Sequence, residues 1–157
     1  MKIAIQRTKE GEGLDFPVYA TEDSAGMDLL AAIEEELTLK PGERALIPAG
    51  FCLALPTGYE AQIRPRSGLA LKYGLTLLNS PGTIDPDYRG QVKVIAINLG
   101  ENSITIKRGD RIAQMIISQI EKIEWNEVEN LPNSTRGSGG FGHSDNNNHR
   151  KKDDNST

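Results

Sequence analysis

The sequence predicts an all-β domain, a jelly-roll-like barrel or sandwich of many short strands. Its apolar segments are short and are separated by turns rich in glycine and proline. The segments between these turns are rich in β-branched residues or alternate in polarity, which favours strands over helices. Aromatic residues make up only 5% of the chain, so the core must be built from Ile, Leu, Val and Ala. A chain of 157 residues is long enough for one such core.

The turns divide the chain into the expected strands. Turn sequences occur at KPGE (40–43), PAG (48–50), PTG (56–58), SPG (80–82) and RGD (108–110). We expect strands in the segments KIAI, LTLKPGERALI, GFCLALP, YEAQIRP, GQVKVIAINL, SITI and RIAQMIISQI. The best helical candidate is SGLALKYG, which Gly68 and Gly74 bracket and which allows at most one short helix.

The composition changes near residue 129, which predicts three regions. Residues 1–129 form the β-barrel domain, 130–144 a flexible C-terminal arm, and 145–157 a disordered tail. Leu131 and Phe141 are the only large apolar side chains after residue 129, too few to offset the entropy lost on ordering. The stretch RGSGGFGHS (136–144) is either a plain linker or an arm that orders over a ligand, with Arg136 for a phosphate and Phe141 for a ring.

Charge and hydropathy narrow the possible partners. The net charge of −4 argues against non-specific binding to nucleic acid, which needs a broad basic surface. No apolar run approaches the roughly 20 residues that span a bilayer, so no membrane partner is expected. The first residues lack the apolar block of a signal peptide, which favours a cytoplasmic location. The single cysteine, Cys52, cannot form an internal disulfide and is expected to pack as a small hydrophobic residue.

Two motifs place charged or polar groups beside a turn or a helix start. In SAGMDLLA, Asp28 stands between a turn and an apolar strand, where an aspartate often only brackets the turn. In IRPRSGLA (63–70), Ser67 and Gly68 follow two arginines at the start of the expected helix. A helix start, a hydroxyl and Arg66 together make an anion site. The alternative is a capping serine beside solvated arginines.

Two further motifs carry candidate catalytic groups. LLNSPGTIDPDYRGQV (77–92) reads as a hairpin in which Asp85 could act as a general base and Tyr88 could lie against a flat or sugar-like group. Asp-Pro-Asp is also common in turns. In GDRIAQ (109–114), Arg111 and Gln114 interrupt an apolar strand. Half-buried polar residues need partners, so they indicate a site or a subunit interface.

Taken together, these stretches resemble one family closely, the trimeric dUTP pyrophosphatases. The motifs stand in the family's order as AGMDL (25–29), PRSGL (65–69), GTIDPDYRG (82–90), RIAQ (111–114) and RGSGGFG (136–142). The match covers nearly everything up to residue 144. The resemblance implies hydrolysis of dUTP to dUMP and pyrophosphate, with water attacking the α-phosphorus and Mg²⁺ bound across the triphosphate. That activity keeps uracil out of DNA and supplies dUMP for thymidylate synthesis.

The resemblance also implies a role for each matching residue. Asp85 would orient and deprotonate the water, and Asp28 would support the hydrated Mg²⁺ indirectly, through water. Phosphate-binding positions are Arg66, Ser67, Gly68 and Gln114, with Arg136 of the arm reaching the γ-phosphate. The uracil pocket would comprise Asn79, Gly82, Thr83 and Ile84, with Phe141 stacking on the base. Tyr88 would pack under the sugar and exclude a 2′-hydroxyl, and Lys93 is a weaker contact candidate.

Finally, the resemblance implies a homotrimer whose active sites are shared between subunits. The chain departs from the family at Gln91, where many members have an acidic residue, and at Met27, where many have an aromatic one. Two alternatives remain open from the sequence. One is a dCTP deaminase-like or bifunctional enzyme on the same fold, and the other is a non-catalytic nucleotide-sensing trimer.

Overall fold

The computed structural model describes residues 1–139. The chain separates into two units, Met1–Lys122 and Ile123–Thr157, and every strand lies in the first. The described residues contain ten strands, one 3-10 helix and one α-helix, which confirms the mostly β prediction. The elements are β1 Ala4–Arg7, η1 Lys9–Gly11, β2 Met27–Leu30, β3 Leu37–Leu39, β4 Arg44–Ala54, β5 Tyr59–Arg64, α1 Ser67–Tyr73, β6 Leu75–Leu77, β7 Gly82–Ile84, β8 Gln91–Asn98, β9 Ile104–Ile106 and β10 Arg111–Gln119.

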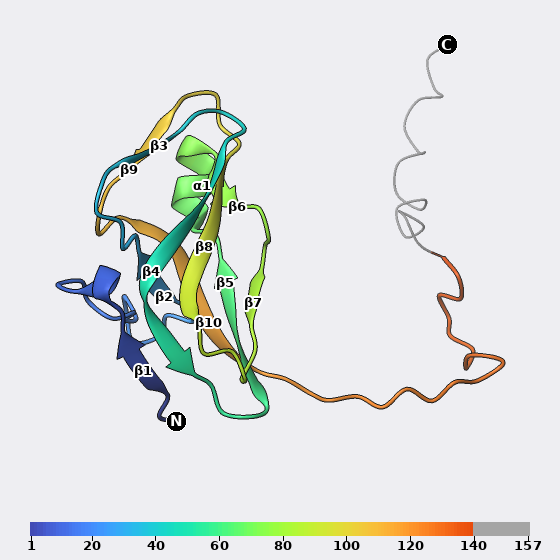
Figure 1. Cartoon of the computed structure of the whole chain (residues 1–157). Coiled ribbons are helices and arrows are strands. Elements are labelled where there is room, and N and C mark those ends of the chain that lie inside the picture. The colour runs from blue at the N-terminus through green and yellow to red at the C-terminus, as the bar shows by residue number, and fades with distance from the viewer. Residues whose placement is uncertain (140–157) are drawn as a thin grey trace, which may run out of the picture. The chain divides into compact units, whose positions relative to one another are not determined.

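The strands of the first unit form a β-sandwich rather than a closed barrel. One sheet has the strand order β1-β4-β8-β6, and the other has the order β2-β10-β5-β7 (Figure 1). A separate pair joins β3 to β9. All of these pairings are antiparallel. The topology crosses between sheets repeatedly, so residues distant in sequence come together at the sheet ends.

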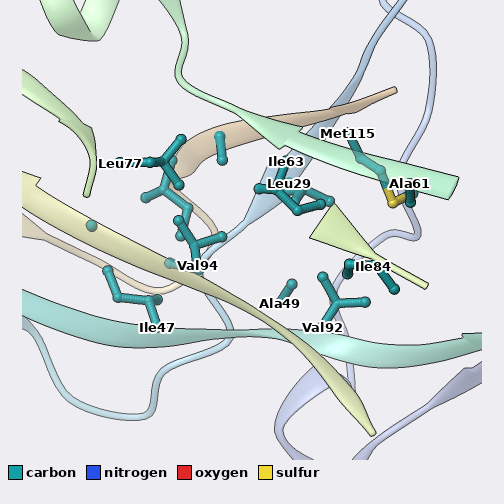
Figure 2. Packing of buried hydrophobic residues seen from close by; sticks show 14 of the residues in the cluster. Leu29, Ile47, Ala49, Ala61, Ile63, Leu77, Ile84, Val92, Val94 and Met115 are labelled. Atoms are coloured by element: carbon teal, nitrogen blue, oxygen red, sulfur yellow. The ribbon is translucent and has the colours of Figure 1, made fainter. Parts of the chain in front are cut away.

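The hydrophobic core lies between the two four-stranded sheets. Figure 2 shows Ile47 and Val94 on one side and Leu29 and Ile63 on the other, with their side chains in the same interior. Along β8, Val92 and its alternate neighbours are buried, while the intervening residues face outward. This period of two is what a strand requires when one face is buried. The core contains one aromatic side chain, Phe51, as the composition implied.

The expected turn at PAG (48–50) is wrong, because β4 runs through it. The strand continues from Arg44 to Ala54, and its register against β8 shifts between Pro48 and Cys52. Gly50 takes a φ of +83°, which a β-branched or bulky residue would not adopt. These features describe a bulge, which bends a strand without ending it. Glycine and proline here signal the bulge rather than a chain reversal.

The one expected helix is confirmed as α1. It ends at Gly74, whose φ of +71° is the left-handed conformation that terminates helices. A Cβ atom at Gly74 would lie 2.3 Å from the amide nitrogen of Gly100, so no side chain fits between the helix end and the loop after β8. Within residues 1–139, no helix is long and apolar enough to cross a bilayer.

The expected hairpin over 77–92 is a corner between the two sheets. β7 pairs with β5, whereas β8 pairs with β4 and β6. The strands on either side of Asp85 therefore belong to different layers. Because Ile84 is buried in the core and Val92 is buried from the other sheet, hydrophobic packing draws the two strands into separate layers. The segment 85–90 that joins them is called the Asp85 loop below.

Candidate active site

Three neighbouring strands bring the first group of candidate residues into one row. In the register of the second sheet, Gln114 of β10 stands opposite Asp28 of β2 on one side. On its other side Gln114 stands opposite Arg64 of β5. Two residues beyond Arg64 the chain reaches Arg66, immediately before α1. Motifs far apart in sequence thus meet at one end of this sheet.

The centre of this row is a charged cluster around Asp28. One carboxylate oxygen of Asp28 lies 2.9 Å from Nε of Arg66, and the other lies 3.6 Å from Nε of Arg111. Arg66 also donates from Nη1 to the main-chain carbonyl of Arg111 at 3.2 Å. The Asp28 side chain is only 21% exposed, so these contacts are partly shielded from water. The polar interruption that the sequence showed at Arg111 is explained by this pairing.

Gln114 is held against the same cluster by its amide group. Its Nε2 donates to the carbonyl of Pro65 at 2.9 Å, which ties β10 to the segment leading into α1. Its Oε1 lies only 2.6 Å from where a Cβ of Gly26 would stand. A side chain at position 26 would therefore displace the Gln114 amide from its present position. Asp28 and Gly26, which stand in one sequence motif, therefore both lie beside Gln114 at this end of the second sheet.

A pocket of about 540 Å³ opens over this row. Its lining includes Asp28, Arg66, Ser67, Gly68 and Gln114. Ser67 and Gly68 are exposed at the start of α1, where the first amide groups of a helix have no intrahelical acceptor. The N-cap residue of α1 is Arg66, and Ser67 is already the first residue of the helix, so the alternative of a capping serine does not describe Ser67. The pocket offers a guanidinium, a hydroxyl, an amide and main-chain N–H groups, which is a set suited to phosphate oxygens.

Sequence reasoning missed Lys72 and Tyr73, which also line the pocket. Lys72 Nζ lies 5.0 Å from the centre of the Tyr73 ring. A hydrogen bond and charge interaction with Tyr73 raise the pKa of Lys72 above its ordinary value. Lys72 follows Gly68 by four residues, which places both on one face of the helix. This spacing of four residues from Gly68 could have identified Lys72 as a candidate from the sequence.

The Asp85 loop presents the second group of candidate residues. The N–H of Tyr88 donates to the carbonyl of Asp85 at 3.2 Å, which closes a turn with Pro86 at its second position. Asp85 is exposed. The Tyr88 hydroxyl donates to the carbonyl of Gln91 at 3.1 Å, and a Cβ at Gly90 would stand 2.3 Å from that hydroxyl oxygen. The tyrosine ring therefore lies directly over Gly90.

The candidate uracil residues lie just before this loop, at the edge of the second sheet. Thr83 is exposed, while the Ile84 side chain is buried in the core. Ile84 can therefore present only main-chain groups. The Asn79 side chain packs over Gly82, with Nδ2 about 3.1 Å from the position of a Cβ there. Lys93 is exposed on β8 opposite Pro48.

The structure does not bring the two groups together within one chain. Ile84 pairs with Ala61, so Asp85 follows at the level of Glu60 on β5. Arg66 lies six residues further along the chain, which corresponds to about 20 Å at the rise of an extended strand. Asp85 and Arg66 therefore lie toward opposite ends of β5.

The remaining candidates belong to the second unit. Arg136 is exposed, and its Nε donates to the carbonyl of Gly139 at 2.7 Å within a local turn. Phe141 lies outside the described residues. Among residues 1–139, no group of three His, Cys, Asp or Glu side chains could hold a metal ion. The described site is a pocket on a β-sandwich whose polar groups suit an anion, with a separate acidic loop.

Comparison with known proteins identifies the family. The dUTPase family model matches residues 13–145. A deoxyuridine 5'-triphosphate nucleotidohydrolase of Rickettsia felis is 57% identical over 141 residues, which cover 90% of this chain and 95% of the relative. One from Rickettsia bellii is 62% identical over 127 residues, covering 81% and 85% respectively. The chain belongs to the dUTPase family.

Solved structures agree with the fold. A mutant of the dUTPase of Staphylococcus bacteriophage 80alpha with dUpNHpp superposes with a TM-score of 0.81 at 26% identity, covering 91% of this chain and 98% of that one. A mutant dUTPase of phage phi11 of S. aureus, described with a structural Mg(II) ion, has a TM-score of 0.73 at 22% identity. It covers 83% of this chain and 99% of the phage chain.

Proposed function

We propose that this chain is a dUTP diphosphatase, which hydrolyses dUTP to dUMP and pyrophosphate. Membership of the dUTPase family, whose relatives are named deoxyuridine 5'-triphosphate nucleotidohydrolases, supports this function. The observation that carries it is the pocket in which Asp28 holds Arg66 beside Ser67, Gly68 and Gln114. The dCTP deaminase-like alternative is not favoured by these relatives. We place the enzyme in the cytoplasm, where the sequence led us to expect it.

The phosphates of dUTP bind in the pocket over α1. Arg66 offers the terminal nitrogens of a guanidinium whose Nε is already oriented by Asp28. Ser67 and Gly68 offer a hydroxyl and main-chain N–H groups, and Gln114 offers its amide. Charge-assisted hydrogen bonds of this kind are about twice as strong as neutral ones. Most of the rate acceleration comes from positioning and from stabilising charge around the phosphates.

Asp85 is the catalytic base. Its carboxylate accepts a proton from a water molecule, whose oxygen forms a bond to the α-phosphorus. The bond from the α-phosphorus to the oxygen bridging toward the β-phosphorus breaks, and pyrophosphate leaves. A carboxylate is the kind of general base that this step needs, and the Asp85 side chain supplies one. Its exposure on the Asp85 loop leaves the carboxylate accessible to water and substrate.

The uracil and the deoxyribose are recognised at the edge of the second sheet. Asn79, Gly82, Thr83 and Ile84 surround the base, where main-chain groups distinguish uracil from cytosine and leave no room for the methyl group of thymine. Tyr88 packs under the sugar and excludes a 2′-hydroxyl. Lys93 is a weaker contact to the nucleotide.

The functional assembly is a homotrimer with shared active sites. The separation of about 20 Å between Asp85 and Arg66 along β5 supports this proposal. A second subunit would bring its phosphate pocket to the Asp85 loop of the first. The arm of a third would close over the nucleotide, with Arg136 at the γ-phosphate and Phe141 on the uracil. Closure of such an arm excludes water other than the nucleophile.

Mg²⁺ is the expected cofactor, and the donor set fits it. The Asp28 carboxylate has about four lone-pair positions, of which the two arginines use only part, so it can also accept a metal-bound water. Asp28 would hold the hydrated ion indirectly while phosphate oxygens bind it directly. When bound, Mg²⁺ neutralises charge on the triphosphate. The residues that orient the phosphates are those of the pocket.

Pyrophosphate release from dUTP, dCTP, dTTP and UTP, each with Mg²⁺ and with EDTA, tests the function. We expect release from dUTP alone, abolished by EDTA. Turnover of dCTP would support the deaminase-like alternative instead. Tight binding of dUTP without turnover would leave only a nucleotide sensor.

Mixed subunits test the shared site. We expect Asp85→Asn and Arg66→Ala chains to be inactive alone. When they are refolded together in equal amounts, about a quarter of the sites should regain both wild-type groups, as random mixing in a cyclic trimer requires. If the mixture stays as inactive as its parts, the two groups act within one subunit.

A further inference from the structure

Gln91 connects two parts of the molecule. Its Nε2 donates to Thr8 Oγ1 at 2.8 Å and to Glu10 Oε2 at 3.3 Å, both in the N-terminal segment. Its main-chain carbonyl accepts the hydroxyl of Tyr88 at 3.1 Å. One residue thus joins the N-terminal segment to the proposed sugar-reading tyrosine.

The position of the Tyr88 ring depends on the main chain of residues 90 and 91. Tyr88 is 46% exposed, so core packing does not fix its ring. The ring rests on Gly90, where a Cβ would come within 2.3 Å of the hydroxyl oxygen. The hydroxyl is tied to the carbonyl of Gln91. A shift of the main chain at the start of β8 would therefore move the ring.

The other end of this connection is attached to a core strand. The N–H of Thr8 donates to the carbonyl of Gly50 at 3.0 Å, within β4. Gly11 lies against the same glycine, since a Cβ at Gly11 would be 2.0 Å from the Gly50 oxygen. Gln91 also stands opposite Cys52 in the β4–β8 register. The main chain on either side of Glu10 is thus held against β4, which keeps the acceptors of Thr8 and Glu10 beside Gln91.

The charge of Glu10 requires a hydrogen-bond donor at position 91. Hydrogen bonds from its own backbone amide and from the Thr8 hydroxyl lower the pKa of Glu10, and Gln91 and the charge of Lys93 lower it further. The carboxylate is therefore ionised at neutral pH and acts only as an acceptor. The amide of Gln91 can donate to it, whereas an acidic residue at this position would repel it.

From these contacts we infer that Gln91 is a positioning residue that sets the selectivity between deoxyribo- and ribonucleoside triphosphates. It acts by holding Tyr88 through the main chain of residues 90–91, and Thr8 and Glu10 anchor its side chain. This inference rests on the proposed function, in which Tyr88 excludes a 2′-hydroxyl.

Exchanging the donor and acceptor groups at positions 91 and 10 tests whether these contacts hold Tyr88 in place. Gln91→Glu replaces the donating amide with a second carboxylate, and we expect the ratio of kcat/KM for dUTP to that for UTP to fall about tenfold, the effect of losing one charge-assisted hydrogen bond. Glu10→Gln alone should change this ratio little, because the amide oxygen of the substituted side chain still accepts. The double variant should restore the ratio to within about threefold, since the new amide at position 10 donates to the new carboxylate at position 91.

Two further variants complete the test. Gln119→Glu introduces the same isosteric charge at the exposed end of β10 and should leave the ratio unchanged. Thr8→Val removes one acceptor of Gln91 while keeping the side chain's shape, and should lower the ratio about threefold even if Gln91→Glu folds poorly. Purely structural damage would lower kcat/KM for dUTP and for UTP equally and would not be rescued by Glu10→Gln.

The outcomes separate this inference from the proposed function. If the wild-type chain fails to hydrolyse dUTP, or hydrolyses UTP equally well, the proposed function is wrong and the inference falls with it. If the wild-type chain is selective and Gln91→Glu keeps its ratio, only the inference is overturned. Loss of the ratio in Gln91→Glu with recovery in the double variant supports it.

Discussion

The phosphate pocket and the Asp85 loop are built in different ways. In the pocket, side chains from β2, β10 and the segment before α1 are joined to one another by ion pairs and hydrogen bonds. In the loop, the order comes from main-chain turns, a glycine and one tyrosine hydroxyl, while Asp85 is left exposed. The pocket therefore fixes its charged groups before substrate arrives, whereas the loop fixes a backbone and leaves its carboxylate accessible.

This difference fits the proposed roles of the two regions, which are phosphate binding by the pocket and proton transfer by the Asp85 loop. Groups that bind the charged phosphates gain from being oriented in advance, because no reorganisation is needed during the reaction. A general base must instead exchange protons with water, so a carboxylate already paired with an arginine would serve poorly. Substitutions in the two regions should accordingly fail in different ways.

Replacing the base should have the largest effect. Asp85→Asn keeps the loop's shape but cannot accept the proton, so we expect kcat for dUTP to fall about 10²- to 10⁴-fold. The dissociation constant of dUTP, measured by calorimetry, should change little. Asp87→Asn, on the same turn and also exposed, is the matched control and should keep most of the activity. Equal losses in the two variants would argue against Asp85 as the base.

Disturbing the support of the pocket should lower stability. Gly74→Ala forces a side chain into a left-handed conformation and against the amide of Gly100, so we expect a loss of about 2–3 kcal/mol in unfolding free energy. Gly58 has a φ of +86° but nothing within 4 Å of a Cβ position. Gly58→Ala should therefore cost only about 1 kcal/mol. Denaturant unfolding of both variants separates conformational strain from the clash.

Changing the chemistry of the pocket should weaken binding rather than turnover. Arg66→Lys keeps the charge but cannot contact both Asp28 and the carbonyl of Arg111 in the way the guanidinium does. We expect KM for dUTP to rise about tenfold, the effect of one misplaced charge-assisted contact, with a smaller change in kcat. Arg64→Lys is the control, since Arg64 bonds only its neighbour Gln62 among the contacts described for its side chain. A fall confined to kcat would contradict a binding role.

The smallest effect concerns the pH dependence of stability. Because the pKa of Glu10 is lowered in the folded chain, its carboxylate contributes stability above its ordinary pKa of 4.5, and this is lost as the pH falls through the lowered value. Glu10 is fully exposed, so the contribution is small. Comparing the unfolding midpoints of wild type and Glu10→Gln at pH 7 and near pH 3 should show a small difference that disappears in acid. A difference that grows in acid would contradict this sign.

The sequence predicted the fold class better than the arrangement of the strands. Alternation and β-branching identified β5, β8 and β10, and the bracketing glycines identified α1. The PAG turn and the 77–92 hairpin were wrong because local signals cannot tell a bulge from a reversal. They also cannot tell a corner between sheets from a paired hairpin. Those distinctions depend on which sheet buries Ile84 and Val92, which is a matter of tertiary packing.

Within the site, the sequence could name Asp28 and Arg66 but not their contact. The ion pair depends on the register between β2, β10 and β5, which no local pattern encodes. The connection from Gln91 to Thr8 spans 83 positions and was equally invisible. The separation of Asp85 from Arg66 along β5 likewise needed the strand pairing.

The contact between Gly11 and Gly50 restricts the substitutions that either position tolerates. A methyl group at either position would collide with the backbone of the other, and Gly50 also has a positive φ. A second substitution would add a collision instead of relieving the first, so no pair of small changes forms a tolerated path. In a library that randomises both codons, glycine should be retained at each independently. This holds although one codon encodes the end of a 3-10 helix and the other a strand of the core.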